Sequence, residues 1–131
     1  MFRNPELARN FVTARNAMTT IYKICPAALW REAKRAGVFR GAPVDLSDGF
    51  IHFSTAAQAA ETAAKHFAGQ GDLLLLHVDG GKLGDRLKWE PSRGGALFPH
   101  LYGELALAAV TQVDSLPLGP DGIHEFPTLS D

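Results

Sequence analysis

The 131-residue sequence has little cysteine, no long apolar run and almost no net charge. Its single cysteine, Cys25, excludes an intramolecular disulfide framework and any zinc or redox site built on a CxxC motif, which is typical of a reducing compartment. The longest apolar run, Leu73 to Leu76 followed by Val78, is much shorter than the roughly 20 residues of a transmembrane helix. We therefore expect a cytoplasmic protein with no membrane segment.

The sequence also has no excess of basic residues: it contains 13 Lys and Arg and 14 Asp and Glu, which gives a net charge of -1. General nucleic-acid binding requires a basic surface that displaces phosphate counterions, and we do not expect it here. The five histidines show no HxH, HxxxH or HExxH spacing, so no metal site is expected. With 46% hydrophobic residues, the composition fits one ordinary globular domain.

The first 17 residues are basic, and we expect them to form a loosely ordered extension before a single domain over residues 18–131. Polar residues interrupt the apolar stretch that a signal peptide would need, and Met18 stands directly before the first strand-like segment. An organellar transit peptide is the alternative, which Glu6 and the lack of a serine-rich composition disfavour. The sequence does not fix the oligomeric state.

Alternation of side chains predicts most of the strands. The apolar run over residues 73–78 predicts a strand buried on both faces, near the middle of a sheet. Residues 105–113 are alternating and β-branched enough for a strand, although their alanines would also suit a helix. The other alternating segments, each expected to form a strand, are 20–24, 50–54 and 86–90.

Two main helices are expected between these strands. Pro26 suits the first turn of a helix over residues 26–36, and Gly37 offers a left-handed stop. Residues 55–58, Thr-Ala-Ala-Gln, have the form of a capping box and predict the start of the second helix. The segments expected to form loops are 41–49, 91–95 and 97–104. This order of elements predicts a mixed α+β domain rather than a doubly wound parallel sheet.

Three short segments rich in aromatic residues place polar groups where packing alone would not require them. The first puts His52 and Ser54 on the same side of a strand, just ahead of a helix N-terminus, which favours anions. A structural hydrogen bond is the alternative for His52. In the other two segments, Glu90, His100 and Tyr102 are either functional groups or part of an aromatic plug over a sheet edge. The segments span residues 48–55, 88–91 and 97–104.

At these segments the sequence resembles the bacterial and plant family called domain of unknown function 952. The resemblance covers about residues 18–113 and rests on four motifs in the same order. They are Ile-Tyr-Lys-Ile at 21–24, Gly-Phe-Ile-His-Phe-Ser-Thr at 49–55 with Gln58, Trp-Glu at 89–90, and Phe-Pro-His-Leu-Tyr-Gly at 98–103.

That family is grouped by similarity with the ADP-ribosyltransferase-like superfamily. The resemblance therefore implies a split β-sheet fold with a cleft for NAD, which would be a substrate. The implied reaction opens the nicotinamide glycosidic bond, stabilises an oxocarbenium-like centre and passes the ADP-ribosyl group to a nucleophile. By position, Lys23 would hold the ribose or a phosphate, while His52 and Ser54 would pack on the nicotinamide. Glu90 would bind a ribose hydroxyl, with Glu104 in reserve.

The candidate catalytic residues are therefore His52, Glu90 and His100. The candidate ligand-binding residues are Lys23, Ser54, Trp89 and Tyr102. The superfamily most often has histidine or arginine where this chain has Lys23, so a non-catalytic module for a nucleotide-like ligand or a protein is the alternative function. A third interpretation treats the motifs as fold determinants, in which case these side chains would lie apart.

Overall fold

The computed structural model describes residues 19–130. The expected extension over residues 1–17 and the expected domain start at Met18 lie outside these described residues. None of the helices within the described range is long and apolar enough to cross a membrane. The described chain forms a mixed α+β fold with antiparallel sheets, which confirms the predicted fold class at that level.

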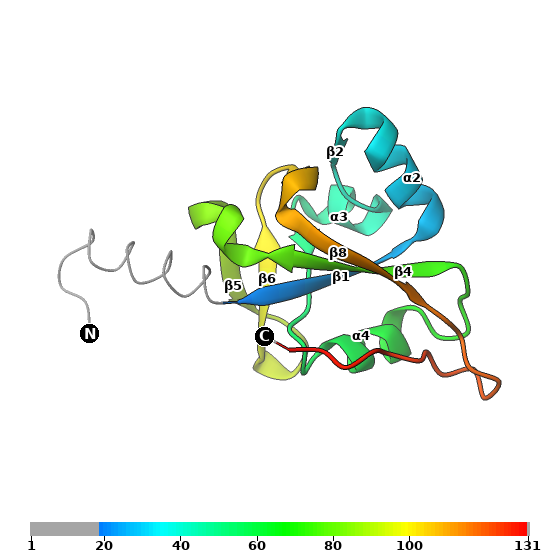
Figure 1. Ribbon diagram of the computed structural model, residues 1–131. Helices are drawn as coiled ribbons and strands as arrows, with labels where there is room; N and C mark the ends of the chain where they lie inside the picture. Colours follow the sequence, from blue (N-terminus) through cyan, green and yellow to red (C-terminus); the bar gives the residue numbers. More distant parts are fainter. Residues whose placement is uncertain (1–18, 131) are drawn as a thin grey trace.

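The largest sheet contains strands β1 (Thr20–Pro26), β4 (Leu73–Asp79) and β8 (Val110–Leu116), in the order β1-β4-β8 (Figure 1). Both neighbours of β4 run antiparallel to it, with Lys23 opposite Leu76 and Val113 on the other side of Leu76. Because Leu75, Leu76 and Val78 are fully buried, β4 is the central strand that its apolar run predicts.

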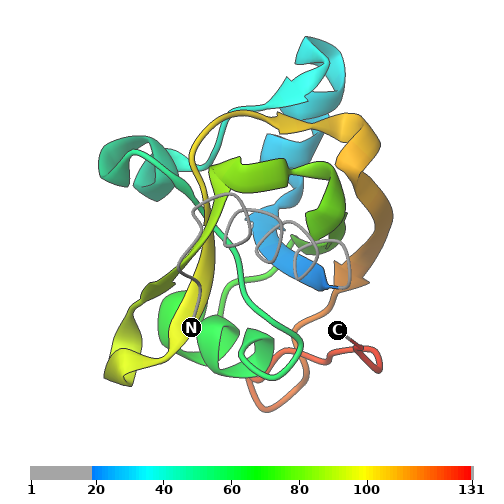
Figure 2. The ribbon, with the colours of Figure 1, turned by 90° about the vertical axis from the view of Figure 1, so that its left-hand side faces the viewer.

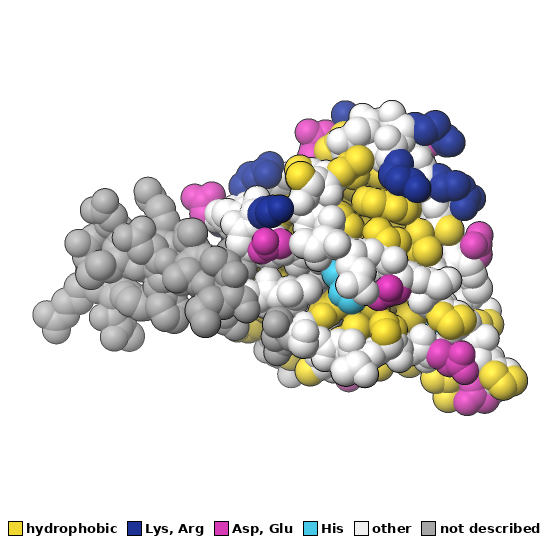
Figure 3. Space-filling model, in the orientation of Figure 1, with side chains coloured by type: hydrophobic (Ala, Val, Ile, Leu, Met, Phe, Trp, Pro, Cys, Tyr) yellow, Lys and Arg dark blue, Asp and Glu magenta, His cyan; other side chains and the backbone are white. Residues whose placement is uncertain are grey.

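Helices α2 (Ala27–Ala36) and α4 (Ala59–His66) cover opposite faces of this sheet (Figure 1). α2 ends at Gly37 in the left-handed conformation, whose N–H donates to the Ala33 carbonyl, as predicted. The outer face of α2 is basic, and Figure 3 shows Lys and Arg side chains gathered over it. α4 starts later than predicted, because residues 56–58 form a turn, although Gln58 accepts the Thr55 N–H as a capping-box residue does.

A second, separate sheet has the order β3-β6-β5, built from β3 (Ile51–His52), β6 (Leu97–Leu101) and β5 (Leu87–Pro91). Among the described residues, its backbone pairs with the first sheet only at an antiparallel bridge between Tyr22 and Ser54, so the β-structure is split at that point. Figure 2 shows β5 and β6 running side by side down to α4. A short pair, β2 (Val38–Phe39) with β7 (Leu105–Ala106), completes the fold.

Other sequence-based predictions are wrong in detail. The loop predicted over 41–49 contains helix α3 (Pro43–Asp48). The loop predicted over 97–104 contains β6, the central strand of its sheet, so the aromatic plug over a sheet edge is also wrong. The single strand predicted over 105–113 is broken into β7, a 3₁₀ turn at Leu107–Ala109 and β8. The other 3₁₀ turns are Gly80–Lys82, Gly84–Arg86 and Arg93–Gly95.

The segment after β8 runs back along α4 (Figure 1). Phe126 and Leu129 pack against the core between α4 and the first sheet, and His124 Nε2 donates to the Gln70 carbonyl at 2.7 Å. This part of the chain therefore belongs to the folded domain.

Candidate functional site

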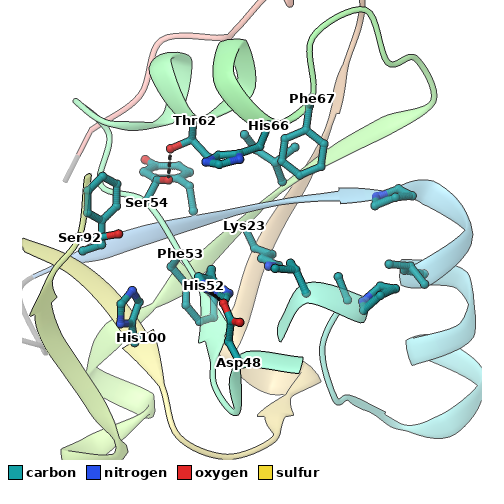
Figure 4. Close-up of a pocket in the computed structure, with 18 of the residues that line it drawn as sticks. Lys23, Asp48, His52, Phe53, Ser54, Thr62, His66, Phe67, Ser92 and His100 are labelled. Carbon is teal, nitrogen blue, oxygen red and sulfur yellow. Dashed lines mark hydrogen bonds and ion pairs between the residues drawn. The ribbon is translucent and has the colours of Figure 1, made fainter. Parts of the chain in front are cut away.

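A cavity of about 560 Å³ opens at the split between the two sheets. Its walls come from β1, α2, α3, α4, β6 and the segment from β3 to Ser54 (Figure 4). Most of the lining is apolar, including Ile24, Leu29, Phe53 and Phe67, with polar groups concentrated near β3 and α4. This volume and this mixture are typical of pockets for small molecules.

Asp45 lies on α3, directly beside the cavity, and is 2% exposed. Its two carboxylate oxygens accept hydrogen bonds from the Lys23 ammonium at 2.9 and 3.1 Å. The Ala42 N–H donates to it at 2.7 Å, and the His52 backbone N–H at 3.1 Å. Burial raises the pKa of Asp45, but the His52 hydrogen bond and the Lys23 charge outweigh burial and lower it to about 2. Asp45 is therefore a buried, ionised carboxylate.

Local sequence explains why α3 forms around Asp45. Pro43 occupies the first helical position, where its missing N–H costs nothing, and Asp45 at the third position accepts the Ala42 N–H. Gly49 ends the helix in the left-handed conformation. Gly41 has φ +119°, and a Cβ there would lie 2.8 Å from the Asp45 Cβ, so the chain can approach Asp45 only with glycine at this position.

His52 stands between two carboxylates. Its Nδ1 lies 2.6 Å from Asp45 Oδ1, and its Nε2 lies 2.9 Å from Asp48 Oδ2. Asp48 is exposed at the mouth of the cavity, whereas Asp45 is buried behind it. Because ionised carboxylates only accept hydrogen bonds, His52 can bond to Asp45 and Asp48 at the same time only when both of its ring nitrogens carry a hydrogen.

A second carboxylate holds a second histidine. His100 is opposite His52 in the β3–β6 register, with the ring centroids 5.5 Å apart, and its Nδ1 lies 2.8 Å from Glu90 Oε1. The Tyr102 hydroxyl donates to the same Glu90 oxygen at 2.8 Å. These two hydrogen bonds lower the pKa of Glu90, and the bond to Glu90 raises the pKa of Tyr102. The Phe50 ring stacks on the His100 ring, with the ring centroids 4.1 Å apart, and this contact fixes the plane of the imidazole.

The opposite wall of the cavity comes from α4. Ser54 and Thr62 share a hydrogen bond of 2.8 Å between their hydroxyls, and His66 and Phe67 lie next to Thr62 (Figure 4). His52, His100 and Asp48 lie across from them in the same view. The cavity therefore has polar groups on two facing walls.

The structure brings most of the candidate residues together but separates two of them. Lys23, His52, Ser54 and His100 line the cavity. Glu90 and Tyr102 lie behind His100 and contact it or its partner. By contrast, Trp89 packs against the hydrophobic core, and Glu104 pairs with Arg40 on the surface.

Sequence reasoning missed Asp45 and Asp48. The Asp48-Gly49 pair looks like a turn, which hides a helix of six residues. The available signal is Ala-Pro-Val-Asp at 42–45, with proline at a first helical position and an acidic residue two places later.

Two other chemistries have little support. Burial raises the pKa of the Cys25 thiol to about 11, against the opposing charge of Lys23, so Cys25 is a buried apolar residue rather than a nucleophile. Within residues 19–130, no three His, Cys, Asp or Glu side chains gather as metal ligands do.

Comparisons with known proteins place the chain in a family. The family model described as "Protein of unknown function (DUF952)" matches residues 24–113. Among solved structures, the crystal structure of protein CC0527 from Caulobacter crescentus is 54% identical, with a TM-score of 0.79, covering 82% of this chain and 94% of that one. The solution NMR structure of CC0527 is 55% identical, with a TM-score of 0.72, covering 79% and 90%. The search of curated proteins finds no match. The chain therefore belongs to the DUF952 family of proteins of unknown function.

Proposed function

We propose that the protein is a transferase or hydrolase that acts on NAD or an ADP-ribosylated substrate in the cavity beside His52. The observation that carries this proposal is that two imidazoles, each held through Nδ1 by a carboxylate, line one cavity of about 560 Å³. The split between the two sheets at Tyr22 and Ser54 supports a fold of the ADP-ribosyltransferase-like type.

The geometry suits opening of an N-glycosidic bond. Nicotinamide leaves with the electron pair of the C–N bond, and water or an acceptor hydroxyl attacks the anomeric carbon and gives up a proton. Glu90 accepts the hydrogen on His100 Nδ1, so His100 Nε2 is the nitrogen that can take this proton. The Asp48 carboxylate at the cavity mouth would stabilise the positive charge that develops on the ribose.

Lys23 has a different role in this proposal from the one that the family resemblance implies, which is to hold the ribose or a phosphate. Its ammonium is 5% exposed and paired with Asp45 at 2.9 Å, so its charge is already balanced. Lys23 therefore acts by holding Asp45 beside His52, and the ligand contacts the imidazoles and hydroxyls instead.

Nicotinamide release tests the proposal. The full chain is incubated with NAD and candidate acceptors, and free nicotinamide is measured for the wild type, His52→Ala, His100→Ala and His77→Gln. We expect release above buffer that falls at least tenfold in the first two variants. His77, which pairs with Asp114 outside the cavity, is the matched control and should leave the rate unchanged. Absence of release from the wild type, or equal rates in His52→Ala and the wild type, would contradict catalysis.

A non-catalytic binding module is the second candidate. The observation that favours it is that His52 already bonds carboxylates through both ring nitrogens. A thermal-shift measurement with ADP-ribose and NAD distinguishes the two, because a ligand that binds only the native state raises the melting temperature. A binding module gives stabilisation and returns NAD unchanged, whereas an enzyme consumes it.

A further inference from the structure

Every group that contacts the Asp45 carboxylate is a hydrogen-bond donor. The four donors are Lys23 Nζ, Ala42 N, His52 N and His52 Nδ1. Three of them, the ammonium and the two backbone amides, cannot accept a hydrogen bond at all. The imidazole is the exception, because it can place its hydrogen on either nitrogen. An ionised carboxylate, which only accepts hydrogen bonds, is therefore the side chain that can bond to all four of these donors.

We propose that Asp45 is a positioning residue that keeps a hydrogen on His52 Nδ1 and thereby fixes which nitrogen of His52 can act at the cavity. With Nδ1 occupied, neutral His52 presents a bare Nε2 on the side of Asp48 and the cavity mouth. Lys23 and Ala42 fix the carboxylate from the far side, so Asp45 cannot turn away from the imidazole. This inference rests on the proposed function for its catalytic meaning, but not for its test.

Replacing Asp45 with alanine removes the acceptor that holds this hydrogen. Asparagine would not, because Oδ1 accepts from both the His52 backbone N–H and Nδ1, so the amide oxygen would keep that position and Nδ1 would keep its hydrogen. In Asp45→Ala, the carboxylate that remains beside the imidazole is Asp48, which faces Nε2 at 2.9 Å. Neutral His52 then carries its hydrogen on Nε2, and the cavity loses a base at this position.

Nitrogen NMR of the imidazoles in the ¹⁵N-labelled full chain tests this directly. The His52 signals are identified as those lost in His52→Gln. We expect a hydrogen on His52 Nδ1 in the wild type at every pH at which it is folded, and a hydrogen on Nε2 of neutral His52 in Asp45→Ala. Asp48→Asn should leave the Nδ1 hydrogen in place. Glu90→Gln is the matched control, because it removes the carboxylate from His100 and should change His100 but not His52.

A bare Nδ1 on wild-type His52, or an unchanged Nδ1 hydrogen in Asp45→Ala, would overturn the proposal. If Asp45→Ala does not fold, the wild type and Asp48→Asn still decide it. Where nicotinamide release is measurable, Asp45→Ala should lower kcat at least tenfold with little change in KM. Absence of release in the wild type defeats the proposed function and leaves the NMR result intact, so the two failures are distinguishable.

Discussion

Asp45 and Glu90 perform the same local task in opposite surroundings. Each accepts a hydrogen bond from Nδ1 of a cavity histidine, at 2.6 Å for Asp45 with His52 and 2.8 Å for Glu90 with His100. The Asp45 side chain is 1% exposed and is held by a buried lysine and two backbone amides. The Glu90 side chain is 36% exposed, and its other partner is the Tyr102 hydroxyl.

This difference in exposure means that the contacts of Asp45 stabilise the fold, whereas those of Glu90 only orient a side chain. A buried charge that loses its partner remains buried and unpaired, which is strongly destabilising. An exposed carboxylate that loses its partner is solvated by water, so little stability is lost. The Asp45 site therefore couples stability to the geometry of His52, whereas the Glu90 site affects the orientation of His100 with little effect on stability.

The largest expected effect follows from Asp45→Ala, which leaves the Lys23 ammonium buried without a counter-charge. We expect a loss of about 3–5 kcal/mol in the free energy of unfolding, measured by urea denaturation. The matched control is Glu104→Ala, which removes an exposed carboxylate from Arg40 and should cost less than about 1 kcal/mol. Equal losses in the two variants would mean that burial does not distinguish these ion pairs.

A smaller effect is expected from acid. The pKa of Asp45 in the folded protein is about 2, below its ordinary value of 3.8, so its ionised form stabilises the fold. That stabilisation is complete above about pH 4 and is lost as the pH falls from about 4 to 2, for a total of about 2 kcal/mol. Urea denaturation across this range should show the loss in the wild type and in Glu90→Gln. A fall of the same size in Asp45→Ala would assign it to other carboxylates.

Glu90→Gln gives the smallest expected change in stability, below about 1 kcal/mol, because Glu90 is partly solvated. The measurable effect of this variant is on the pKa of Tyr102 instead. The pKa of Tyr102 is raised by its bond to Glu90, so this variant should return it toward the ordinary value of about 10, followed by NMR titration of the tyrosine ring. An unchanged Tyr102 pKa would show that the hydrogen bond to Glu90 is absent in solution.

The sequence predicts the first sheet better than the second. β1, α2 and β4 follow from strong local patterns. Alternating side chains predict β1, Pro26 and Gly37 mark the two ends of α2, and the apolar run over residues 73–78 predicts β4. β6 is missed because Pro99 argues against a central strand. The structure accommodates Pro99 because it lies opposite Phe53, one residue past the end of β3. The Phe53 N–H still donates to the Pro99 carbonyl, so the one bond that the missing N–H cannot make falls at the end of this ladder.

The candidate site is predicted in part for a similar reason. His52, Ser54 and His100 carry local motifs, and tertiary folding places them on one cavity. Asp45 has no such motif, since its role depends on Lys23 from a strand 22 residues earlier in the chain. Contacts of this kind arise from tertiary structure, which side-chain periodicity does not report.

The five histidines provide a direct test of the central claim that one cavity binds the ligand. His52, His66 and His100 line it, whereas His77 pairs with Asp114 outside it, and His124 bonds to the carbonyl of Gln70, a residue of the cavity wall. Titration of the full chain with ADP-ribose, followed by imidazole NMR, should shift the three cavity histidines with a single dissociation constant and leave His77 unchanged. A shift at His77 alone, or no shift at any histidine, would contradict the account.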